Sequence, residues 1–321
     1  MTEQAFPDFE HALAGAQKRL NDALLGSPSL VREYTAHLAM SPGKQLRARC
    51  LLACAQQEDG RVPADAAPLA AGVELLHLAT LVHDDVMDDA GLRRGAPTLQ
   101  ARYGKRVAVI CGDWLLAAAL RTAAALNDRE RFLSLRLPGY IGRVCLGELR
   151  QTAENGNLGL TAPQYLRIIG GKTAALFAGS FYAGALLFTD EHELRQRYAR
   201  FGRYLGLLFQ LADDLGDFTL DQDLARKPVR SDYEQGVITL PLIHALAKDP
   251  ELSARAREGR IPMDELAERV RAGGGLDFTR ALCRRYHDRA LRLLPALHAP
   301  KEKEARLLSL LERAGRAAQP F

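Results

Sequence analysis

The apolar residues of this 321-residue chain recur at the spacing of an amphipathic helix along nearly its whole length. Ala, Leu and Arg, which are strong helix formers, dominate these segments, and no stretch shows a convincing strand-like alternation of apolar and polar residues. Gly and Pro punctuate the sequence between the periodic segments. The pattern therefore predicts an all-α fold. We expect helices at residues 9–25, 28–39, 44–57, 66–89, 105–126, 131–154, 163–188, 192–218 and 236–248, with three more after residue 262.

No linker rich in Pro, Gly or Ser divides the chain, and no short repeat appears in it. The hydrophobic share of 47% is enough for one large core or two ordinary ones, so length alone leaves the number of domains open. The lack of a linker favours one. We predict that residues 1–321 form a single domain, built as one large helical bundle.

The charge and the cysteine content limit the possible binding partners and the cellular compartment. Lys and Arg number 43 against 39 Asp and Glu, and so small an excess argues against a nucleic-acid partner. None of the five cysteines has C-x-x-C spacing, and most lie in apolar runs, as free thiols do in a reducing compartment. The apolar run at residues 174–188 is shorter than the roughly 20 residues of a membrane span. We therefore expect it to be a buried helix. From the cysteines we predict a cytoplasmic protein, and we expect no signal peptide.

Two apolar helices end in the same acidic pattern, D-D-x-x-D. The pattern comprises Asp84, Asp85 and Asp88 in the first helix and Asp213, Asp214 and Asp217 in the second. Residues four apart lie on one face of a helix, where like charges repel, and the helix dipole disfavours acids at a C-terminus. A solvated acidic helix end explains one such motif well, but it explains two copies poorly. The pair therefore indicates a bound cation.

Mg²⁺ suits these motifs best, because it prefers oxygen ligands and is usually held by one or two carboxylates together with substrate phosphates. No cluster of His or Cys in the sequence favours a softer metal. If the two helices face each other, their carboxylates can bind a diphosphate through bridging ions.

Basic residues stand near both acidic motifs or open neighbouring helices. They are Lys44 and Arg47 after Gly43, Arg93 and Arg94 after the first motif, Lys172 before Thr173, and Lys227 after the second motif. Arg binds phosphate oxygens through a bidentate fork and Lys does so as a point charge. Each residue taken singly is a common surface charge, and His77 taken singly is a common core histidine. Taken together they indicate two anion sites, one bridged by metal and one free of it.

These motifs, in this order, resemble the trans-isoprenyl (polyprenyl) diphosphate synthases over nearly the full length of the chain. The matching stretches are Gly43-Lys44-x-x-Arg47, the run from His77 to Asp88, Arg93-Arg94-Gly95-x-Pro97-Thr98, Gly112-Asp113, Lys172-Thr173, the run from Phe209 to Asp217, Lys227-Pro228 and Thr239-Leu240-Pro241. The resemblance implies the isoprenoid synthase fold, an all-α bundle around a deep central cavity. It also implies a homodimer whose substrates are isopentenyl diphosphate and an allylic diphosphate.

The resemblance further implies a role for each matching residue. Mg²⁺, three ions per site, is held by Asp84, Asp88, Asp213 and Asp217, with Asp85 and Asp214 as further catalytic carboxylates. Arg93, Lys172 and Lys227 bind the allylic diphosphate. Gly43, Lys44, Arg47, His77 and Arg94 form the isopentenyl diphosphate site. Thr173 and Gln210 face the reacting allylic carbons.

Product length is expected to depend on the residues one turn or more before Asp84. Leu76, Ala79 and Thr80 would line the cavity, and Ala79 lies about 7.5 Å down the helix axis from Asp84. Bulky aromatic residues at this level stop growth early in the family, whereas Ala79 and Thr80 are small. The resemblance is strongest to the octaprenyl and heptaprenyl types, so we expect an all-trans product of C30 to C50 for quinone side chains.

Other functions remain open at this point. A geranylgeranyl diphosphate synthase would make a shorter product. A class I terpene cyclase needs no second diphosphate site, and a non-catalytic subunit of a heteromeric synthase should have lost acidic or basic residues that this chain keeps. The Arg-rich segments at residues 284–285 and 301–313 are a solvated helix face or, at most, a peripheral membrane contact.

Overall fold

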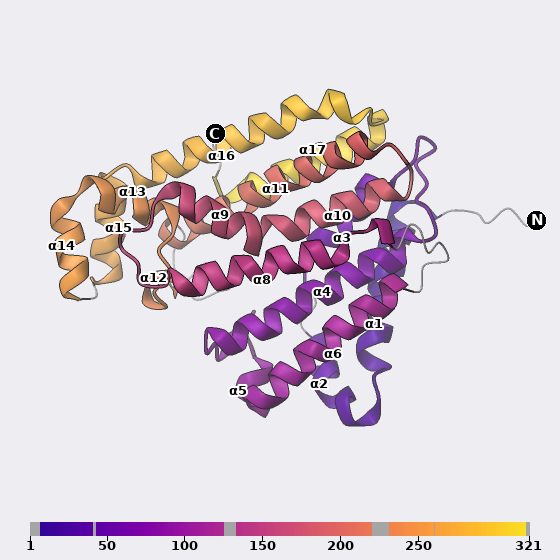
Figure 1. Ribbon diagram of the computed structural model, residues 1–321, viewed down its shortest axis with the longest axis horizontal. Helices are drawn as coiled ribbons and strands as arrows, with labels where there is room; N and C mark the ends of the chain where they lie inside the picture. The colour runs from indigo at the N-terminus through magenta and orange to yellow at the C-terminus, as the bar shows by residue number, and fades with distance from the viewer. Residues whose placement is uncertain (1–6, 41–42, 125–132, 220–230, 260, 319–321) are drawn as a thin grey trace, which may run out of the picture. The chain divides into compact units, whose positions relative to one another are not determined.

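The computed structural model describes residues 7–40, 43–124, 133–219, 231–259 and 261–318. Most of them are helical, and the strands of the described part are the two-residue β1 (Leu92–Arg93) and β2 (Ala96–Pro97). Figure 1 shows the helices. The all-α prediction is confirmed. The helices are α1 Phe9–Leu25, α2 Ser29–Ala39, α3 Leu46–Ala55, α4 Ala66–Met87, α5 Leu99–Tyr103, α6 Lys105–Ala124, α8 Leu137–Ala153, α9 Ala162–Lys172, α10 Ala174–Leu186, α11 His192–Thr219, α12 Ser231–Glu234, α13 Leu240–Lys248, α14 Pro250–Glu258, α15 Met263–Ala272, α16 Gly275–Leu293 and α17 Lys301–Gly315, with 3₁₀ turns at Leu294–Leu297 and Arg316–Ala318.

The chain folds into two compact units. The first unit comprises Met1–Leu137, Gly179–Ala199 and Ala296–Leu307, and the second comprises Pro138–Ala178, Arg200–Pro295 and Leu308–Phe321. Helices α10, α11 and α17 contribute residues to both. The assignment of residues 1–321 to a single domain stays a prediction.

In the first unit, α4 packs against α1, α3 and α6 (Figure 1). Small residues let the helices approach closely. At Gly112 of α6, an added Cβ would lie 2.3 Å from Nε2 of His83 on α4, so only glycine leaves room for that imidazole. His83 in turn lies 3.3 Å from Asp113. The Gly112-Asp113 pair of the sequence motif therefore fixes the packing of α6 beside the first acidic motif.

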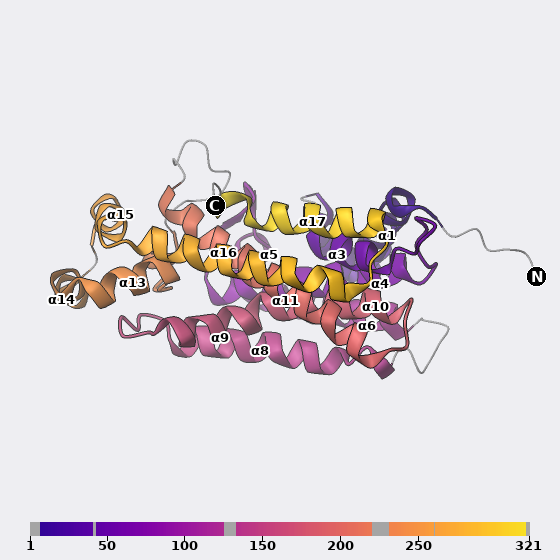
Figure 2. The same ribbon diagram turned by 90° about the horizontal axis from the view of Figure 1, so that it is seen from above.

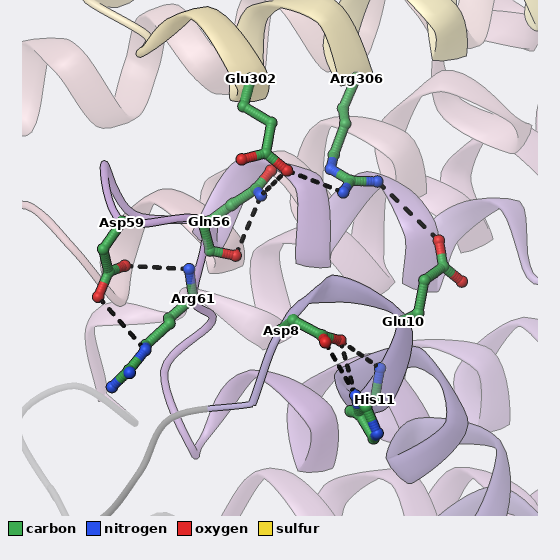
Figure 3. A network of polar contacts seen from close by, with 9 residues as sticks. Asp8, Glu10, His11, Gln56, Asp59, Arg61, Glu302 and Arg306 are labelled. Carbon is green, nitrogen blue, oxygen red and sulfur yellow. Dashed lines mark hydrogen bonds and ion pairs between the residues drawn. The ribbon is translucent and has the colours of Figure 1, made fainter.

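A polar network also belongs to the first unit (Figure 3). Glu302 at the start of α17 accepts hydrogen bonds from Gln56 and from Arg306, both at 3.1 Å. Arg306 also lies 3.9 Å from Glu10 and over the ring of Phe9. The network attaches the start of α17 to α1 and to the segment that follows α3.

In the second unit, α8 crosses α9 where glycine faces glycine. A Cβ added at Gly147 would lie 2.2 Å from the backbone nitrogen of Lys172, and one added at Gly171 would lie 2.9 Å from Cα of Gly147. Figure 2 shows these two helices side by side. In the same unit, α13 and α15 pack against α16, and α14 packs against α13 (Figure 2).

Most expected helices lie within a few residues of their predicted bounds, but several corrections are needed. The helix expected at 163–188 is two helices, because α9 ends at Lys172 and Thr173 interrupts the chain before α10. The helix expected at 236–248 begins at Leu240, where Thr239 is the N-cap and Pro241 occupies the first turn. Helix α14 and the short helices α5 and α12 were not predicted. Part of the helix expected at 131–154 lies outside the described residues.

By length and composition alone, α4 and α6 could each cross a membrane. About half of the apolar stretch of α4, 56%, is buried inside the protein, as in the core helix of a water-soluble fold. Helix α10 is shorter and is buried almost throughout, which confirms the prediction of a buried helix at residues 174–188.

Candidate active site

The first acidic motif lies at the C-terminal end of α4. Asp84 and Asp85 occupy the last helical turn, and Asp88 is the C-cap, whose backbone N–H donates to the Asp84 carbonyl at 2.8 Å. Asp88 is exposed and Asp84 is half-buried. The carboxylates of Asp84 and Asp88 are therefore placed at a helix end where the dipole is negative, an arrangement that a bound cation would stabilise.

Asp85 has a different environment from its two neighbours. It is only 5% exposed, and Arg93 Nε donates to its Oδ1 at 2.7 Å. Burial raises the pKa of Asp85, whereas the charge of Arg93 and its hydrogen bond lower it. Arg93 can reach Asp85 because the chain reverses direction in a hairpin whose two turn residues are Arg94 and Gly95. Both have positive φ, as in the favoured type I′ hairpin turn. Arg93, predicted to bind the allylic diphosphate, is thus paired with Asp85 in this structure.

The basic site of the first unit forms around the beginning of α3. Arg94 projects from the hairpin turn so that its guanidinium lies against Gly43, where an added Cβ would be 3.0 Å from Nη1. Arg47 lies in the first turn of α3. Burial, followed by the charges of Arg47 and Arg94, holds the pKa of His77 well below its usual value. The imidazole is therefore neutral at pH 7 and can donate one hydrogen bond and accept another. Lys44 is exposed just before this helix.

Glu74 lies at the centre of this basic site, and sequence reasoning missed it. It is one turn before His77 on α4 and is 9% exposed. The backbone N–H of Ala48 donates to Glu74 Oε1 at 2.8 Å. Burial raises the pKa of Glu74, and the charges of Arg47 and Arg94 oppose that rise. A lone Glu in an apolar helix belongs to no short motif. Its place on the same side of the helix as His77 and Asp84 was the only sequence signal.

The second acidic motif lies in the last turns of α11, which continues to Thr219. Asp213 is exposed and Asp217 is half-buried, but Asp214 is only 1% exposed. Asp214 accepts a hydrogen bond of 2.5 Å from the hydroxyl of Tyr165 and one of 3.0 Å from Nε2 of Gln210. Burial raises the pKa of Asp214 to about 8, against the opposing effect of these two hydrogen bonds. Tyr165 is a further residue that sequence reasoning missed.

The hydrogen-bond chain continues from Gln210 to Thr173. The Thr173 hydroxyl donates to Oε1 of Gln210 at 2.7 Å, so both ends of the Gln210 amide are fixed. This contact depends on the break between α9 and α10 and on Gly206, one turn before Gln210. A Cβ at Gly206 would lie 2.7 Å from Cα of Ala174 and 2.9 Å from the Phe177 ring. The structure thus brings together Thr173, Gln210 and Asp214 as one hydrogen-bonded group, held by Tyr165.

Lys172 makes an ion pair of 2.8 Å with Glu148, which follows Gly147 at the crossing of α8 and α9. Both side chains are largely buried, with exposed fractions of 29% for Lys172 and 15% for Glu148. The predicted diphosphate-binding lysine therefore has an acidic neighbour that the sequence did not indicate. Lys227, predicted for the same role, lies outside the described residues.

The chemistry of the second motif fits a divalent cation. Within the described ranges, no three or more His, Cys, Asp or Glu residues lie close enough to form a complete metal site. However, the buried Oδ2 of Asp217 has no hydrogen-bond partner among the described residues. Burial and the neighbouring carboxylates, Asp232 first, raise the pKa of Asp217 to about 8. A cation ligated there would satisfy this oxygen, and Mg²⁺ completes such partial sites with waters and substrate phosphates.

The three residues expected to set product length lie on the middle of α4. Leu76 and Ala79 are buried, and Ala79 is 2% exposed. Thr80 is half-buried, and its hydroxyl donates to the carbonyl of His77 at 2.7 Å. No bulky side chain stands at the positions four and five residues before Asp84.

The chain is similar in sequence and in fold to known proteins. The family profile described as Polyprenyl synthetase matches residues 28–265, a range that includes both acidic motifs and the basic site. The heptaprenyl diphosphate synthase component 2 of Geobacillus stearothermophilus is 36% identical over 295 residues, which are 89% of each chain.

Solved structures give the same result. The crystal structure of heptaprenyl diphosphate synthase from Staphylococcus aureus has a TM-score of 0.87 at 30% identity and covers 97% of this chain and 99% of its own. The polyprenyl synthase from Caulobacter crescentus CB15, complexed with calcium and isoprenyl diphosphate, has a TM-score of 0.86 at 29% identity and covers 97% and 96%. The chain therefore belongs to the polyprenyl synthetase family of trans-isoprenyl diphosphate synthases, with the all-α isoprenoid synthase fold.

Proposed function

We propose that this protein is a Mg²⁺-dependent prenyltransferase that condenses isopentenyl diphosphate with an allylic diphosphate, such as farnesyl diphosphate, and repeats the addition to make a long all-trans polyprenyl diphosphate. Family membership supports the reaction class. The proposal also specifies that the metal is Mg²⁺, that three ions bind at each site, and which product is made.

One observation supports the proposal beyond family membership: groups that could bind an anion without a metal lie together around the beginning of α3. Arg47 and Arg94 supply two guanidinium groups, and neutral His77 supplies a hydrogen-bond donor. His77 stands on α4, two turns before Asp84 on the same helix. An enzyme that joins two diphosphates needs a second anion site of this kind. A terpene cyclase, which ionises a single diphosphate, does not.

We propose that Asp84, Asp88, Asp213 and Asp217 hold the metal. Mg²⁺ bound there supplies positive charge that stabilises the leaving diphosphate of the allylic substrate. The side chains of the protein perform the remaining tasks. Lys172 would bind the same diphosphate, in exchange for part of its ion pair with Glu148. Arg47, Arg94, Lys44 and His77 would hold isopentenyl diphosphate.

The fixed Thr173–Gln210 pair suits the stabilisation of an electron-poor carbon. The hydroxyl hydrogen of Thr173 points to Gln210, so the lone pairs of its oxygen are available in another direction. Preorganised dipoles of this kind stabilise developing charge without reorganising during the reaction. When the allylic C–O bond breaks, the double bond of isopentenyl diphosphate forms the new C–C bond. The departing diphosphate then takes the proton, which restores an allylic diphosphate for the next cycle.

Incorporation of labelled isopentenyl diphosphate into product, with farnesyl diphosphate as primer, tests the reaction. We expect incorporation with Mg²⁺ and at least a thousandfold loss in excess chelator, since the metal supplies several kcal/mol of the stabilisation. A product that contains no label would indicate a cyclase instead, and full turnover in chelator would contradict the metal assignment.

We propose a product of C30 to C50, because the side chains of Ala79 and Thr80 are too small to block a growing chain at this level. Ala79→Phe should shorten the product to farnesyl or geranylgeranyl length, as chromatography of the dephosphorylated products would show. Leu78→Phe, on a neighbouring part of the same helix, is the matched control, and it should leave the length unchanged. An unaltered product distribution in Ala79→Phe, or a wild-type product of C20, would contradict this part of the proposal.

We also propose that the purified chain acts as a homodimer in the cytoplasm. The relative from Geobacillus stearothermophilus is named as one component of its synthase, so a requirement for a second, different subunit is the specific alternative. Turnover by the chain expressed and purified alone, with its mass measured by light scattering, separates the two. No turnover alone, together with turnover after another subunit is added, would favour the heteromeric assembly.

A further inference from the structure

Glu74 is an acid placed inside a site that must bind an anion. It is 9% exposed, on the face of α4 that carries His77 one turn later. Its neighbours are the charged groups of Arg47 and Arg94. A carboxylate in this position would repel a diphosphate if it acted by charge alone, so its presence requires another explanation.

The oxygens of Glu74 are directed to the beginning of α3. Oε1 accepts the backbone N–H of Ala48 at 2.8 Å, and the backbone of Arg47 provides a further hydrogen bond. Gln45 is the N-cap residue of α3. Its backbone has a left-handed conformation, and its side chain makes no capping hydrogen bond. Glu74 therefore caps α3 from another helix, where a negative charge also complements the helix dipole.

The same carboxylate balances two like charges. Arg47 and Arg94 repel each other, and burial acts against the charged form of each. Attraction to Glu74 opposes both effects. Arg94 is also confined by Gly43, which leaves no room for a side chain beside the guanidinium. The charge of Glu74 therefore favours the charged forms of both arginines in this partly buried space.

We propose that Glu74 is a positioning residue. It fixes Arg47 and Arg94 in the orientation that binds a diphosphate without metal. It also occupies the backbone N–H groups at the beginning of α3, so that side chains bind the diphosphate instead. This inference rests on the proposed function, because it concerns the isopentenyl diphosphate site. Two effects compete. Repulsion by Glu74 weakens anion binding, whereas preorganisation of the two arginines strengthens it. The proposal is that preorganisation is the larger effect.

Glu74→Gln tests the proposal, because the amide keeps the shape and one acceptor oxygen for the Ala48 N–H but removes the charge. We expect the Kd for inorganic pyrophosphate, measured by calorimetry in excess chelator, to rise about tenfold, the usual scale for residues that orient a binding group. In the assay, the KM for isopentenyl diphosphate should rise by a similar factor, while kcat and the KM for the allylic diphosphate stay within about threefold.

Glu74→Asp retains the charge but withdraws it by one methylene group, so it should recover part of the lost affinity. It also serves if Glu74→Gln does not fold, since an intermediate rise in the pyrophosphate Kd is then expected. Glu302→Gln is the matched control. It removes a glutamate charge in the same unit, from the network of Figure 3, which includes none of the basic-site residues, and it should leave the Kd and both KM values unchanged.

Tighter pyrophosphate binding in Glu74→Gln would show that Glu74 chiefly repels the anion, and an unchanged Kd would show that it only supports the fold. Either result overturns the proposal. Pyrophosphate binding in chelator requires no turnover. A wild-type protein that binds pyrophosphate but incorporates no isopentenyl diphosphate would therefore contradict the proposed function while leaving the role of Glu74 testable.

Discussion

The two D-D-x-x-D motifs have the same sequence pattern but different surroundings. In the first motif, basic side chains outside the helix pair with the acids: Arg93 with Asp85, and Lys105 with the following Asp89. In the second, neutral groups hold the middle acid, because Tyr165 and Gln210 both donate to Asp214. The second aspartate of the motif is therefore an ion-pair partner in one unit and a hydrogen-bond acceptor in the other.

Burial and local charge explain this difference. Both Asp85 and Asp214 are buried, and burial raises the pKa of each. For Asp85, the nearby positive charge of Arg93 opposes the rise. For Asp214, only hydrogen bonds oppose it, and the acids Asp232 and Asp213 raise the pKa further. The first motif is thus stabilised mainly by charge and the second mainly by hydrogen bonds, which predicts different responses to substitution.

The largest expected effect is common to both motifs. If the first and last aspartates of each motif hold the metal, Asp84→Asn and Asp213→Asn should each lower kcat/KM by about 10²–10³-fold, the usual loss when one electrostatic contact to the transition state is removed. Steady-state incorporation of isopentenyl diphosphate measures it. Asp59→Asn, on the exposed ion pair with Arg61, is the control. A loss confined to one motif would mean that the two do not share the catalytic task.

The next effect separates the motifs. Tyr165→Phe leaves buried Asp214 without one of its two donors, which should lower the free energy of unfolding by about 1–3 kcal/mol in urea titrations. Because Asp214 fixes Gln210, kcat should also fall, and more allylic diphosphate should be hydrolysed to alcohol instead of being extended.

Tyr198→Phe is the matched control for this prediction. Tyr198 is also buried, and its hydroxyl donates to the Leu297 carbonyl at 3.1 Å. This variant should lose stability while keeping kcat and the ratio of alcohol to extended product. If Tyr165→Phe behaves in the same way, Asp214 supports the fold and does not position Gln210.

The sequence was sufficient to predict the helices and the two acidic motifs, because both depend on local spacing. The periodicity of apolar residues predicted α1, α2 and α4 nearly to the residue. The break at Thr173 could not be predicted in this way, since apolar residues continue in helical register on both sides of it. Its cause is tertiary: α8 approaches at Gly147 and α11 at Gly206.

The supporting residues were missed for a related reason. Glu74, Glu148 and Tyr165 each stand alone in the sequence, outside any short motif, and each acts on a residue from another helix. Burial of a single polar residue depends on which helices meet, and that information is not local. Motifs therefore indicated the residues proposed to touch substrate or metal, and the structure showed the isolated residues that contact them or their neighbours.

A smaller effect is expected from Asp85→Asn. The variant keeps an oxygen to accept from Arg93 and loses the charge of a pair whose arginine is 37% exposed. Partly exposed pairs contribute about 1 kcal/mol or less, and removing a buried charge offsets part of that loss. The free energy of unfolding should therefore change less than in Tyr165→Phe, by the same urea titration. An equal or greater loss would show that charge holds the first motif as firmly as hydrogen bonds hold the second.

The smallest effect is expected from Lys105→Met, which removes the 3.0 Å ion pair with Asp89. The side chains of both residues are more than half exposed, so water and salt already screen their attraction. The thermal midpoint should fall only slightly at about 0.1 M NaCl, and the difference from wild type should disappear at about 1 M, where the Debye length falls from about 10 Å to about 3 Å. Tyr165→Phe should show no such dependence on salt, because a buried neutral donor is not screened. A salt-dependent loss in Tyr165→Phe, or a salt-independent loss in Lys105→Met, would reverse the assignment of charge to the first motif and hydrogen bonds to the second.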